Sequence, residues 1–538
     1  MRRLLLCLVL PACGSDATGP ITAHVTHYDY ALDLDTRAAS VKVSLVADAR
    51  GNCMTLPFRA SEFAAPKFDG LDADALIDPN GSVQICGTGI EAGETFDVEG
   101  AMTIDLATLS TSQVGYSVTM DSAHNPFTYM VSWVNGCDRF GLCDSRPDQF
   151  ATYRFDVTHA ANLTVRCSGD VTDPSPTETI CNFDHPGGPT YSTFGLAAYP
   201  AWTQSDLGDW SGVHVTLYDR PGTGIAAGID NAWHAGFVDW MQSQFGAFPF
   251  GSELRLLTAP TYWNGFEHPG NIVLADSLTR QVGYANTLQH TLDHEMTHMW
   301  AGDQTTIAST YDFVWKESMA EYLTYVYEDM KDPAVSLVTS DVWKADSSNA
   351  RYFPVPLDHP ELFMYYTDVY GPGPMVLFRQ LEVLSSREQV LAALQTVLGK
   401  QRALTVDELT AALADKTGLD LTDYITAWIK GSGAPNWPRF DLTYTPGSLV
   451  VHEVSPTTPA RGCKFHVALR GANPGEVAKV EVDTFHHGTD QTLPVTAPAF
   501  TVTKLELDPD HECLVFLASE SPRVAPHAPW VNPDFVTH

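Results

Sequence analysis

The chain has 538 residues, more than one hydrophobic core usually organises, so its length predicts about three or four domains. Hydrophobic residues make up 44% of the chain, which is typical of a globular protein. The 65 acidic residues outnumber the 31 basic ones and give a formal net charge of -34. A surface of that sign repels nucleic acid and anionic lipid headgroups, so it argues against nucleic-acid binding and favours solubility.

The first 20 residues predict an export signal. Two arginines precede an apolar run at residues 4–10, which is too short to span a bilayer as a helix. Leu10-Pro11-Ala12-Cys13 is similar to the cleavage box of bacterial lipoproteins, in which Cys13 would become the lipidated first residue. An ordinary cleaved signal is the alternative. We therefore expect an exported protein, either a lipoprotein of the cell envelope or, since one lipid chain anchors weakly, a secreted one.

Eight further cysteines follow Cys13. An even number of cysteines in an exported chain indicates disulfide bonds rather than reactive thiols. Sequence cannot fix the connectivity, but the grouping along the chain suggests the pairs Cys53–Cys86, Cys137–Cys143, Cys167–Cys181 and Cys463–Cys513. No pair has the spacing of a zinc ribbon, so the cysteines are not the metal site.

Residues 21–212 predict an N-terminal β domain. Apolar and polar side chains alternate in short runs, for example at 24–34 and 41–46, and Gly, Pro, Asn and Asp separate the runs. This period of two with frequent turns is typical of a β-sandwich or a curved sheet.

Helical periodicity replaces the alternation in residues 213–437. Gly302 is expected to cap the end of one long helix and Asp312 the start of the next. Thr405-Val406-Asp407-Glu408 has the pattern of a capping box, which predicts the start of a further helix. The other predicted elements are a helix at 229–245, a strand at 254–257, and helices at 284–301, 312–330 and 422–430.

A glycine- and proline-rich segment at 431–438 predicts a domain boundary. Alternation then returns, for example at 449–454 and 477–482, and predicts a small C-terminal β-sandwich over residues 438–538.

The central motif is His294-Glu295-Met296-Thr297-His298, on the helix predicted at 284–301. Positions i and i+4 differ by about 40° around a helix, so both imidazoles leave the same face and can bind one ion. Neutral imidazole suits zinc, and Glu295 lies where it can take a proton from water at the open position of a catalytic site. The motif alone is moderately specific, because a helix with two surface histidines has the same pattern.

Glu317 supplies a third ligand. Eighteen residues lie between His298 and Glu317, enough to end one helix and begin a second. Two crossing helices can aim His294, His298 and Glu317 at one zinc ion and leave a fourth position for water, which is the pattern of catalytic zinc. Glu321, one turn further, either orients a ligand histidine or is an ordinary exposed helix charge.

The stretch from Leu292 to Tyr322 resembles the zinc core of the aminopeptidase N family, the gluzincin aminopeptidases. The family pattern is His-Glu-x-x-His, eighteen residues and Glu, with a second motif that usually reads Trp-Leu-Asn-Glu-Gly-Phe-Ala. Here the second motif reads Val314-Trp315-Lys316-Glu317-Ser318-Met319-Ala320, so the ligand matches and several neighbours differ. Lys316, beside the ligand, can alter the local field. The resemblance is strong over about 265–377 and implies a thermolysin-like α/β zinc catalytic domain at 213–437.

The resemblance also assigns substrate-binding roles to Gly265 and Glu267. The family carries Gly-x-Met-Glu-Asn on an edge strand before the zinc helix, and Gly265-Phe266-Glu267-His268-Pro269 occupies that place. Glu267 falls on the glutamate that would pair with the α-ammonium group of a substrate; an exposed loop carboxylate is the alternative reading. A carboxylate fixed beside zinc favours a free amine over a blocked one. The family's further Gln or Glu for the amine has no clear counterpart at 129–135.

Tyr370 is the family's tyrosine by register. The family reads Tyr-x-Lys-Gly-x-x-Val-Leu, and residues 370–377 fit this pattern with Pro372 in place of lysine. A tyrosine hydroxyl near the scissile carbonyl would donate to the oxyanion as it forms. Tyr365 and Tyr366 are nearby competitors, and a packed core tyrosine is the alternative reading.

The predicted domains indicate a multidomain α+β protein, and the N-terminal signal indicates export. The resemblance implies an aminopeptidase with one zinc ion that hydrolyses N-terminal residues, with Glu295 as general base. Expected partners are peptides with a free N-terminus, with no nucleic acid and with membrane contact only through a lipid at Cys13; a monomer is expected. One alternative is a thermolysin-like endopeptidase, which would also cleave N-acetylated peptides. The other is a catalytically silent, surface-anchored binding protein, supported by the departures at Phe266, His268, Lys316 and Pro372. The preferred N-terminal residue cannot be identified from the sequence.

Overall fold

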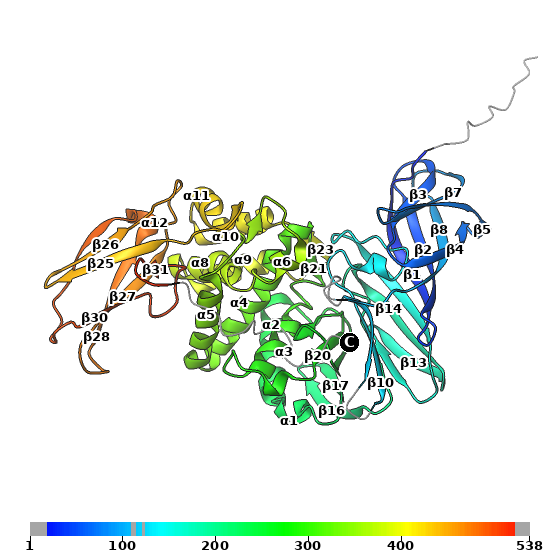
Figure 1. Ribbon diagram of the computed structural model, residues 1–538, viewed down its shortest axis with the longest axis horizontal. Helices are drawn as coiled ribbons and strands as arrows, with labels where there is room; N and C mark the ends of the chain where they lie inside the picture. The colour runs from blue at the N-terminus through cyan, green and yellow to red at the C-terminus, as the bar shows by residue number, and fades with distance from the viewer. Residues whose placement is uncertain (1–18, 109–113, 121–123, 522–538) are drawn as a thin grey trace, which may run out of the picture.

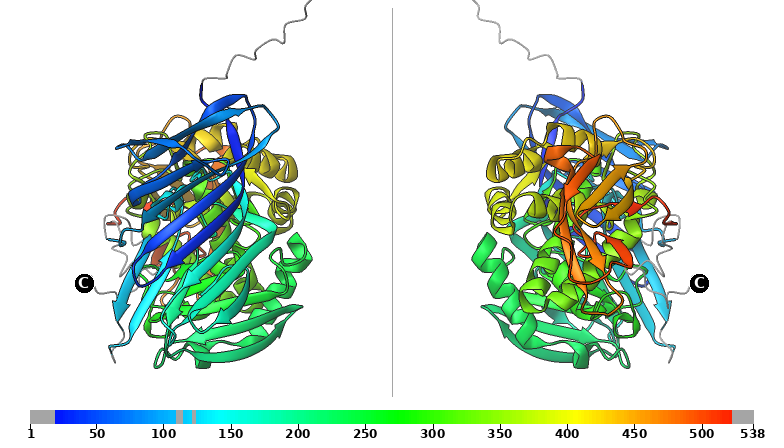
Figure 2. Two further views of the ribbon diagram at one scale, coloured as in Figure 1. Left: turned by 90° about the vertical axis from the view of Figure 1, so that its right-hand side faces the viewer. Right: turned by 90° about the vertical axis from the view of Figure 1, so that its left-hand side faces the viewer.

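The computed structural model describes residues 19–108, 114–120 and 124–521; the predicted export signal and Cys13 lie outside the described residues. A β-rich N-terminal region lies at one end of an elongated molecule, helices occupy the middle, and a small β-rich C-terminal region lies at the other end (Figure 1). The two end-on views show the N-terminal sheets from one side and the C-terminal strands from the other (Figure 2). The multidomain α+β architecture predicted from the sequence is confirmed. In the described part of the chain, every helix is too short or too polar to cross a membrane.

In the described N-terminal region the largest sheet has eight strands, in the order β13-β14-β11-β1-β2-β8-β4-β5. Alternating side chains build it: Val25, Tyr30 and Leu32 of β1 are buried while their neighbours are more exposed. Strand β1 pairs antiparallel with β2 and parallel with β11. Smaller sheets, ordered β12-β15-β10-β9 and β3-β7-β6, complete the region.

The bounds of these elements are β1 (Ala23–Asp33), β2 (Ala38–Ala47), β3 (Gly51–Pro57), β4 (Ser61–Phe68), β5 (Leu71–Asp72), β6 (Asp74–Asp78), β7 (Ser82–Ile90), β8 (Thr95–Thr103), β9 (Gly115–Met120), β10 (Pro126–Val131), the 3-10 turn η2 (Cys137–Arg139), β11 (Phe150–Thr158), β12 (Thr164–Cys167), β13 (Asp170–Ser175), β14 (Glu178–Pro189) and β15 (Leu196–Tyr199).

The helical middle is built on a five-stranded sheet in the order β16-β17-β18-β20-β19. Strands β17, β18 and β20 are parallel, and the short edge strand β19 runs antiparallel to β20. Strand β20 is buried along its whole length, as expected for a strand covered on both faces. Strand β16 pairs with β17 in a hairpin and so joins this sheet, although it precedes residue 212, where the sequence predicts the boundary. The alternation simply continues through the hairpin, so the pattern alone does not mark the change of sheet.

The bounds in this region are β16 (Thr203–Trp210), β17 (Val213–Asp219), α1 (Ile225–Gly228), α2 (Asn231–Phe245), β18 (Glu253–Ala259), β19 (Gly265–Phe266), β20 (Asn271–Ala275), η3 (Leu278–Arg280), α3 (Thr287–Thr297), β21 (Thr305–Ile307), η4 (Thr310–Asp312), α4 (Phe313–Lys331), α5 (Pro333–Ser347), β22 (Val355–Pro356), α6 (Leu362–Tyr366), α7 (Pro372–Pro374), the π-helical turn η5 (Met375–Arg379), α8 (Gln380–Leu384), α9 (Arg387–Val397), β23 (Arg402–Leu404), α10 (Val406–Thr417), α11 (Thr422–Tyr424), the π-helical turn η6 (Ile425–Ile429) and β24 (Lys430–Gly431).

Three helix ends were predicted from capping residues, and one of them differs in the structure. Thr405 and Glu408 form the predicted capping box at the start of α10. Asp312 stands at the predicted N-cap of α4, although its side chain accepts no capping hydrogen bond. The prediction that Gly302 caps the first zinc helix is wrong, because α3 ends at Thr297 with His298 as its C-cap. The chain then turns, so that Gly302 lies beside His298 with a positive φ of 152°.

The described C-terminal region consists of two small sheets, ordered β29-β26-β25-β31 and β28-β27-β30. Their elements are β25 (Arg439–Thr445), β26 (Ser448–Glu453), β27 (Lys464–Arg470), β28 (Val477–Asp483), α12 (Thr484–His487), β29 (Gln491–Pro494), β30 (Lys504–Leu507) and β31 (Phe516–Leu517). This arrangement agrees with the small β-sandwich predicted from the returning alternation.

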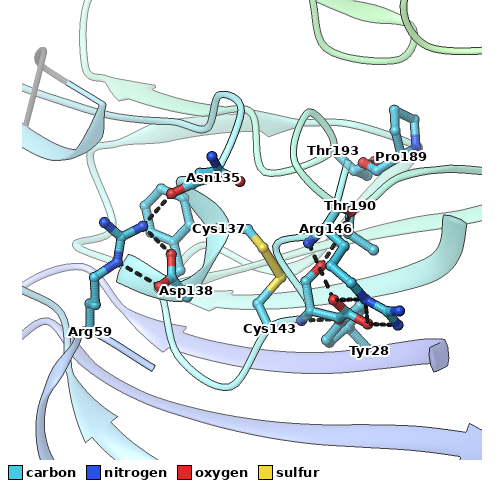
Figure 3. Close-up of a disulfide and its surroundings, with 12 residues drawn as sticks. Tyr28, Arg59, Asn135, Cys137, Asp138, Cys143, Arg146, Pro189, Thr190 and Thr193 are labelled. Carbon is cyan, nitrogen blue, oxygen red and sulfur yellow. Dashed lines mark hydrogen bonds and ion pairs between the residues drawn. A yellow bond between two sulfur atoms is a disulfide. The ribbon is translucent and has the colours of Figure 1, made fainter. Parts of the chain in front are cut away.

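The four disulfides suggested by the grouping of the cysteines are all present. Cys137–Cys143 closes a short loop of the N-terminal region (Figure 3). Arg59 holds one side of that loop by ion pairing with Asp138 and donating to the carbonyl of Asn135. The loop is thereby fixed to the sheet region.

The segment just before this loop reaches the helical middle. The indole ring of Trp133 packs against the rings of Phe313 and Tyr366, with centroids 5.3 and 4.5 Å apart. Asn135 Nδ2 donates to Thr310 Oγ1 at 3.1 Å. The N-terminal region therefore packs against the helical middle beside α4.

Candidate active site

The three zinc-ligand candidates converge on one point. His294 lies in α3, His298 caps it, and Glu317 lies in α4, which packs against α3. The Nε2 atoms of the two histidines are 3.1 Å apart, and Oε2 of Glu317 lies 3.3 Å from one and 3.5 Å from the other. All three side chains are buried. Zinc–ligand bonds of about 2.0–2.2 Å in a tetrahedron place ligand atoms about 3.3–3.6 Å apart, so this set fits zinc.

The other nitrogen of each histidine lies close to an oxygen atom of the protein. His298 Nδ1 donates to the carbonyl of Ala301 at 3.0 Å, which leaves the lone pair of Nε2 directed at the other candidates. His294 Nδ1 lies 3.1 Å from Oε1 of Glu321. Both rings therefore present Nε2, not Nδ1, to the point of convergence.

Glu321 is part of a buried polar cluster, so its reading as an exposed helix charge is wrong. Its side chain is only 3% exposed. Trp343 Nε1 donates to Oε2 of Glu321 at 2.7 Å, and His290 Nε2 lies 3.3 Å from the same oxygen. Neither partner was predicted from the sequence. His290 could have been found, because it stands one helical turn before His294, whereas Trp343 comes from α5 and its sequence position carries no signal.

Helix α3 is anchored on the side of Asp293. Trp233 Nε1 donates to one oxygen of Asp293 at 2.7 Å, and His234 Nδ1 lies 2.8 Å from the other. Asn286 caps the start of the helix by accepting from the backbone N–H of Gln289 at 3.2 Å. These contacts with α2 and the N-cap set the rotation of α3, and with it the direction of His294.

Glu295 lies directly against the backbone of Gly265. A Cβ added to Gly265 would come within 2.1 Å of Oε1 of Glu295, so only glycine leaves room for this carboxylate. Burial raises the pKa of Glu295 to about 8, and the nearby carboxylates Glu267 and Glu317 add to the rise, which His294 partly opposes. A carboxyl group with a pKa near neutrality is suited to taking up and releasing a proton.

Glu267 is buried at the end of β19, which rules out the reading of an exposed loop carboxylate. Lys316 Nζ lies 2.6 Å from Oε1 of Glu267 and 2.8 Å from Oε1 of Glu317. Burial by itself would raise the pKa of Glu267, but the ammonium group of Lys316 outweighs it, so the pKa is lowered. Glu267 is therefore an anion that already has a partner from the protein.

The N-terminal region holds the Glu267 segment in place. Ser192 Oγ donates to the backbone carbonyl of Glu267 at 2.8 Å, and His268 Nδ1 donates to the carbonyl of Ser192 at 2.5 Å. A Cβ at Gly195 would lie 2.2 Å from the His268 ring, so the backbone passes close over that ring. His268 thus contacts the N-terminal region.

Tyr370 lies beside the ligand histidines, with its ring centroid 6.1 Å from that of His294. Its hydroxyl makes a short hydrogen bond to the hydroxyl of Tyr366. The third tyrosine of this segment, Tyr365, donates to the carbonyl of Pro354 at 2.5 Å and is occupied there. Of the two competitors named from the sequence, only Tyr366 therefore shares the environment of Tyr370.

A cavity of about 30 Å³ opens between these groups, enough for one or two water molecules. Aromatic rings and ionisable side chains line it together, and they include Trp263, Tyr366, Tyr370, His294 and Glu295. The structure thus gathers in one place the predicted catalytic, substrate-binding and metal-ligating residues, namely Gly265, Glu267, His294, Glu295, His298, Glu317 and Tyr370.

Comparison with known proteins agrees with this geometry. Residues 263–428 match the family described as the peptidase family M1 domain. The resemblance to the aminopeptidase N family of zinc metallopeptidases is confirmed. The family is zinc-dependent, in keeping with the candidate ligands His294, His298 and Glu317.

Among curated proteins, aminopeptidase N of Streptomyces lividans is 24% identical over 367 residues, which are 60% of this chain and 40% of the relative. The chain thus spans less than half the length of that relative. Among solved structures, an M1 zinc metallopeptidase from Deinococcus radiodurans has a TM-score of 0.63 at 20% identity, over 76% of this chain and 94% of that one. A variant of it bound to a Tyr-Ser-Ala substrate has a TM-score of 0.64 at 19% identity, with the same coverage.

Proposed function

We propose that the chain is a zinc-dependent aminopeptidase that hydrolyses N-terminal residues from peptides. The placement of Glu267 carries the proposal, because ligand-capable atoms of Glu267, Glu295 and His298 all lie within 4.8 Å of one another. A carboxylate that can accept a hydrogen bond from the N-terminal nitrogen of a substrate thus lies beside the general-base candidate and a zinc-ligand candidate. A peptide anchored there by its first nitrogen presents its first peptide bond to Glu295.

The chemistry follows from the groups in place. His294, His298 and Glu317 would hold the zinc ion, which would serve as a Lewis acid for the scissile carbonyl and for water. Glu295 takes the proton that the water loses and delivers it to the leaving amine. The Tyr370 hydroxyl donates to the carbonyl oxygen as negative charge develops there.

We also propose how many zinc ions the protein binds and where it is located. One zinc ion is supported by the convergence of the three candidate ligands on a single point. Export, either as a lipoprotein through Cys13 or as a secreted protein, is supported by four disulfides, since such bonds persist in oxidising compartments.

The proposal predicts chelator-sensitive hydrolysis of substrates with a free amine. The purified protein is assayed with a panel of fluorogenic aminoacyl amides and their N-acetylated counterparts, before and after chelation. We expect hydrolysis of the free-amine substrates only, lost on chelation and restored by zinc. Equal cleavage of the acetylated substrates would favour the endopeptidase alternative, and no cleavage by zinc-loaded protein would favour the silent binding protein.

The matched variant is Glu295→Gln, which keeps the size of the side chain and removes the base. Turnover should fall by about 10²–10⁴-fold while zinc content, measured by atomic emission, stays at the wild-type level. Substantial residual turnover would remove Glu295 from the role of base.

A further inference from the structure

Lys316 is a buried cation inside the active site. Its side chain is fully buried, and its ammonium group bridges Oε1 of Glu267 and Oε1 of Glu317 at 2.6 and 2.8 Å. Burying a lone cation is costly, and two charge-assisted contacts offset that cost. Glu267 is also the carboxylate to which we assign the substrate's α-ammonium group.

The fold builds a space for this lysine. A Cβ at Gly302 would lie 2.9 Å from Cε of Lys316, so the glycine leaves the room through which the side chain passes. Tyr191 OH donates to the carbonyl of Gly302 at 3.0 Å and holds that backbone in place. The ring of Phe313 lies 5.4 Å from Nζ of Lys316, within the range of a cation–π contact. Contacts from several elements thus fix the position of the Lys316 ammonium group next to Glu267.

A substrate ammonium group bound to Glu267 would share that carboxylate with Nζ of Lys316. Lys316 already offsets part of the negative charge of Glu267, and the two like charges of Lys316 and the substrate would repel each other. Residues 129–135, where the sequence comparison looks for a further acceptor for the amine, contain no carboxylate, so this segment adds no second negative charge.

We propose that Lys316 is a specificity-determining residue that offsets the charge of Glu267, so that the site recognises an N-terminal nitrogen with little contribution from its positive charge. This inference rests on the proposed aminopeptidase function and deepens it. The favoured substrates are peptides whose first residue presents a small, hydrogen-bonding α-substituent, charged or neutral. The charge of the amine contributes little to this recognition.

The test compares two ligands of equal size. An α-aminoacyl amide and the corresponding α-hydroxyacyl amide differ at one atom, and only the first carries a charge. A charge-assisted hydrogen bond to an unpaired carboxylate favours the amino compound by about tenfold or more. For the wild-type protein we expect an amino-to-hydroxy ratio in kcat/KM below about tenfold, and a ratio of tenfold or more would overturn the inference.

Three variants test the contribution of Lys316 to the amino-to-hydroxy ratio. Lys316→Met removes the charge and keeps the length, and should raise the amino-to-hydroxy ratio by about tenfold or more, mainly through a lower KM for the amino substrate. Lys316→Arg retains a positive charge at this position and should keep the amino-to-hydroxy ratio near the wild-type value. Lys344→Met removes the other strongly buried lysine, which pairs with Asp508 at 2.5 Å, and controls for lost stability without a change in the ratio. A ratio that stays at the wild-type value in Lys316→Met would overturn the inference.

A binding measurement separates this inference from the proposed function. In the Glu295→Gln background, titration calorimetry with leucinamide and 2-hydroxy-4-methylpentanamide gives the same ratio without turnover. If no variant hydrolyses any substrate but Lys316→Met shifts the binding ratio, the proposed function fails and the role of Lys316 stands. If free-amine substrates are hydrolysed and neither ratio responds to Lys316→Met, the function stands and the role of Lys316 fails.

Discussion

At the scale of single residues, the site depends on close approaches that leave no room for a substitution. Glu295 lies against Gly265, and Lys316 passes over Gly302. The spacing of the His-Glu-x-x-His motif and of Glu317 predicts the ligands because helix geometry fixes where they point. The contact between Lys316 and Glu267 could not be predicted. The two residues belong to different elements, and the side chain of Lys316 reaches Glu267 by passing over the turn at Gly302.

Gly265→Ala should impair catalysis without removing zinc. The added Cβ would lie 2.1 Å from Oε1 of Glu295, so the carboxylate has to move. A displacement of about 1 Å at a catalytic group costs on the order of 10²-fold in kcat. Steady-state kinetics and zinc content of the variant give the check.

Gly475→Ala is the control, since its added Cβ meets no atom within 4 Å. It should leave kcat unchanged. Wild-type kcat in a folded Gly265→Ala protein would show that the carboxylate adapts, and that the glycine is not required for catalysis.

At the scale of elements, the zinc ligands depend on how α3, α4 and α5 pack. Periodicity predicts the helices that carry His294 and Glu317, and the capping box at Thr405 is confirmed. The end of the zinc helix was not predicted, because the turn that follows Thr297 is closed by backbone hydrogen bonds, such as that from Asp303 N–H to the carbonyl of His298, that no side-chain pattern marks. The cluster around Glu321 also needed the structure, since α5 supplies Trp343.

Glu321→Gln should weaken zinc binding. His294 Nδ1 lies 3.1 Å from Glu321, and groups that orient a ligand histidine typically contribute about 10–100-fold to metal affinity. Competition with a fluorescent chelator measures the affinity. Glu453→Gln replaces a buried glutamate of the C-terminal region and should bind zinc as the wild type does. Equal affinities of the two variants would show that Glu321 has only a packing role.

At the scale of the whole molecule, each disulfide closes a loop within one region, and none of the four joins the N-terminal region to the C-terminal one. The grouping of the cysteines predicted these pairs because neighbours in sequence share a region. The joining of β16 to the middle sheet was not predicted, because an alternating hairpin looks the same in either sheet.

Removal of Cys463–Cys513 should destabilise its region more than removal of Cys137–Cys143 destabilises the N-terminal region. The sequence separations are 50 and 6 residues, and the entropy of loop closure gives about 4 kcal/mol for the longer and about 2 kcal/mol for the shorter. Urea unfolding of the paired Cys→Ala variants, followed by tryptophan fluorescence, measures the two losses of unfolding free energy. A larger loss for the shorter loop would show that native contacts outweigh chain entropy.

The contact between Gly302 and Lys316 also has a consequence for how such a site evolves. The φ of 152° at residue 302 disfavours every amino acid except glycine, whatever side chain stands at 316. The backbone at Gly302 therefore provides the space that the lysine side chain fills, and no second substitution is needed to make room for it. Asparagine, the family's usual residue before the ligand glutamate, and lysine are related by one nucleotide change in their codons. Recognition of the N-terminal charge can thus be gained or lost in one mutational step, without first remodelling the metal site.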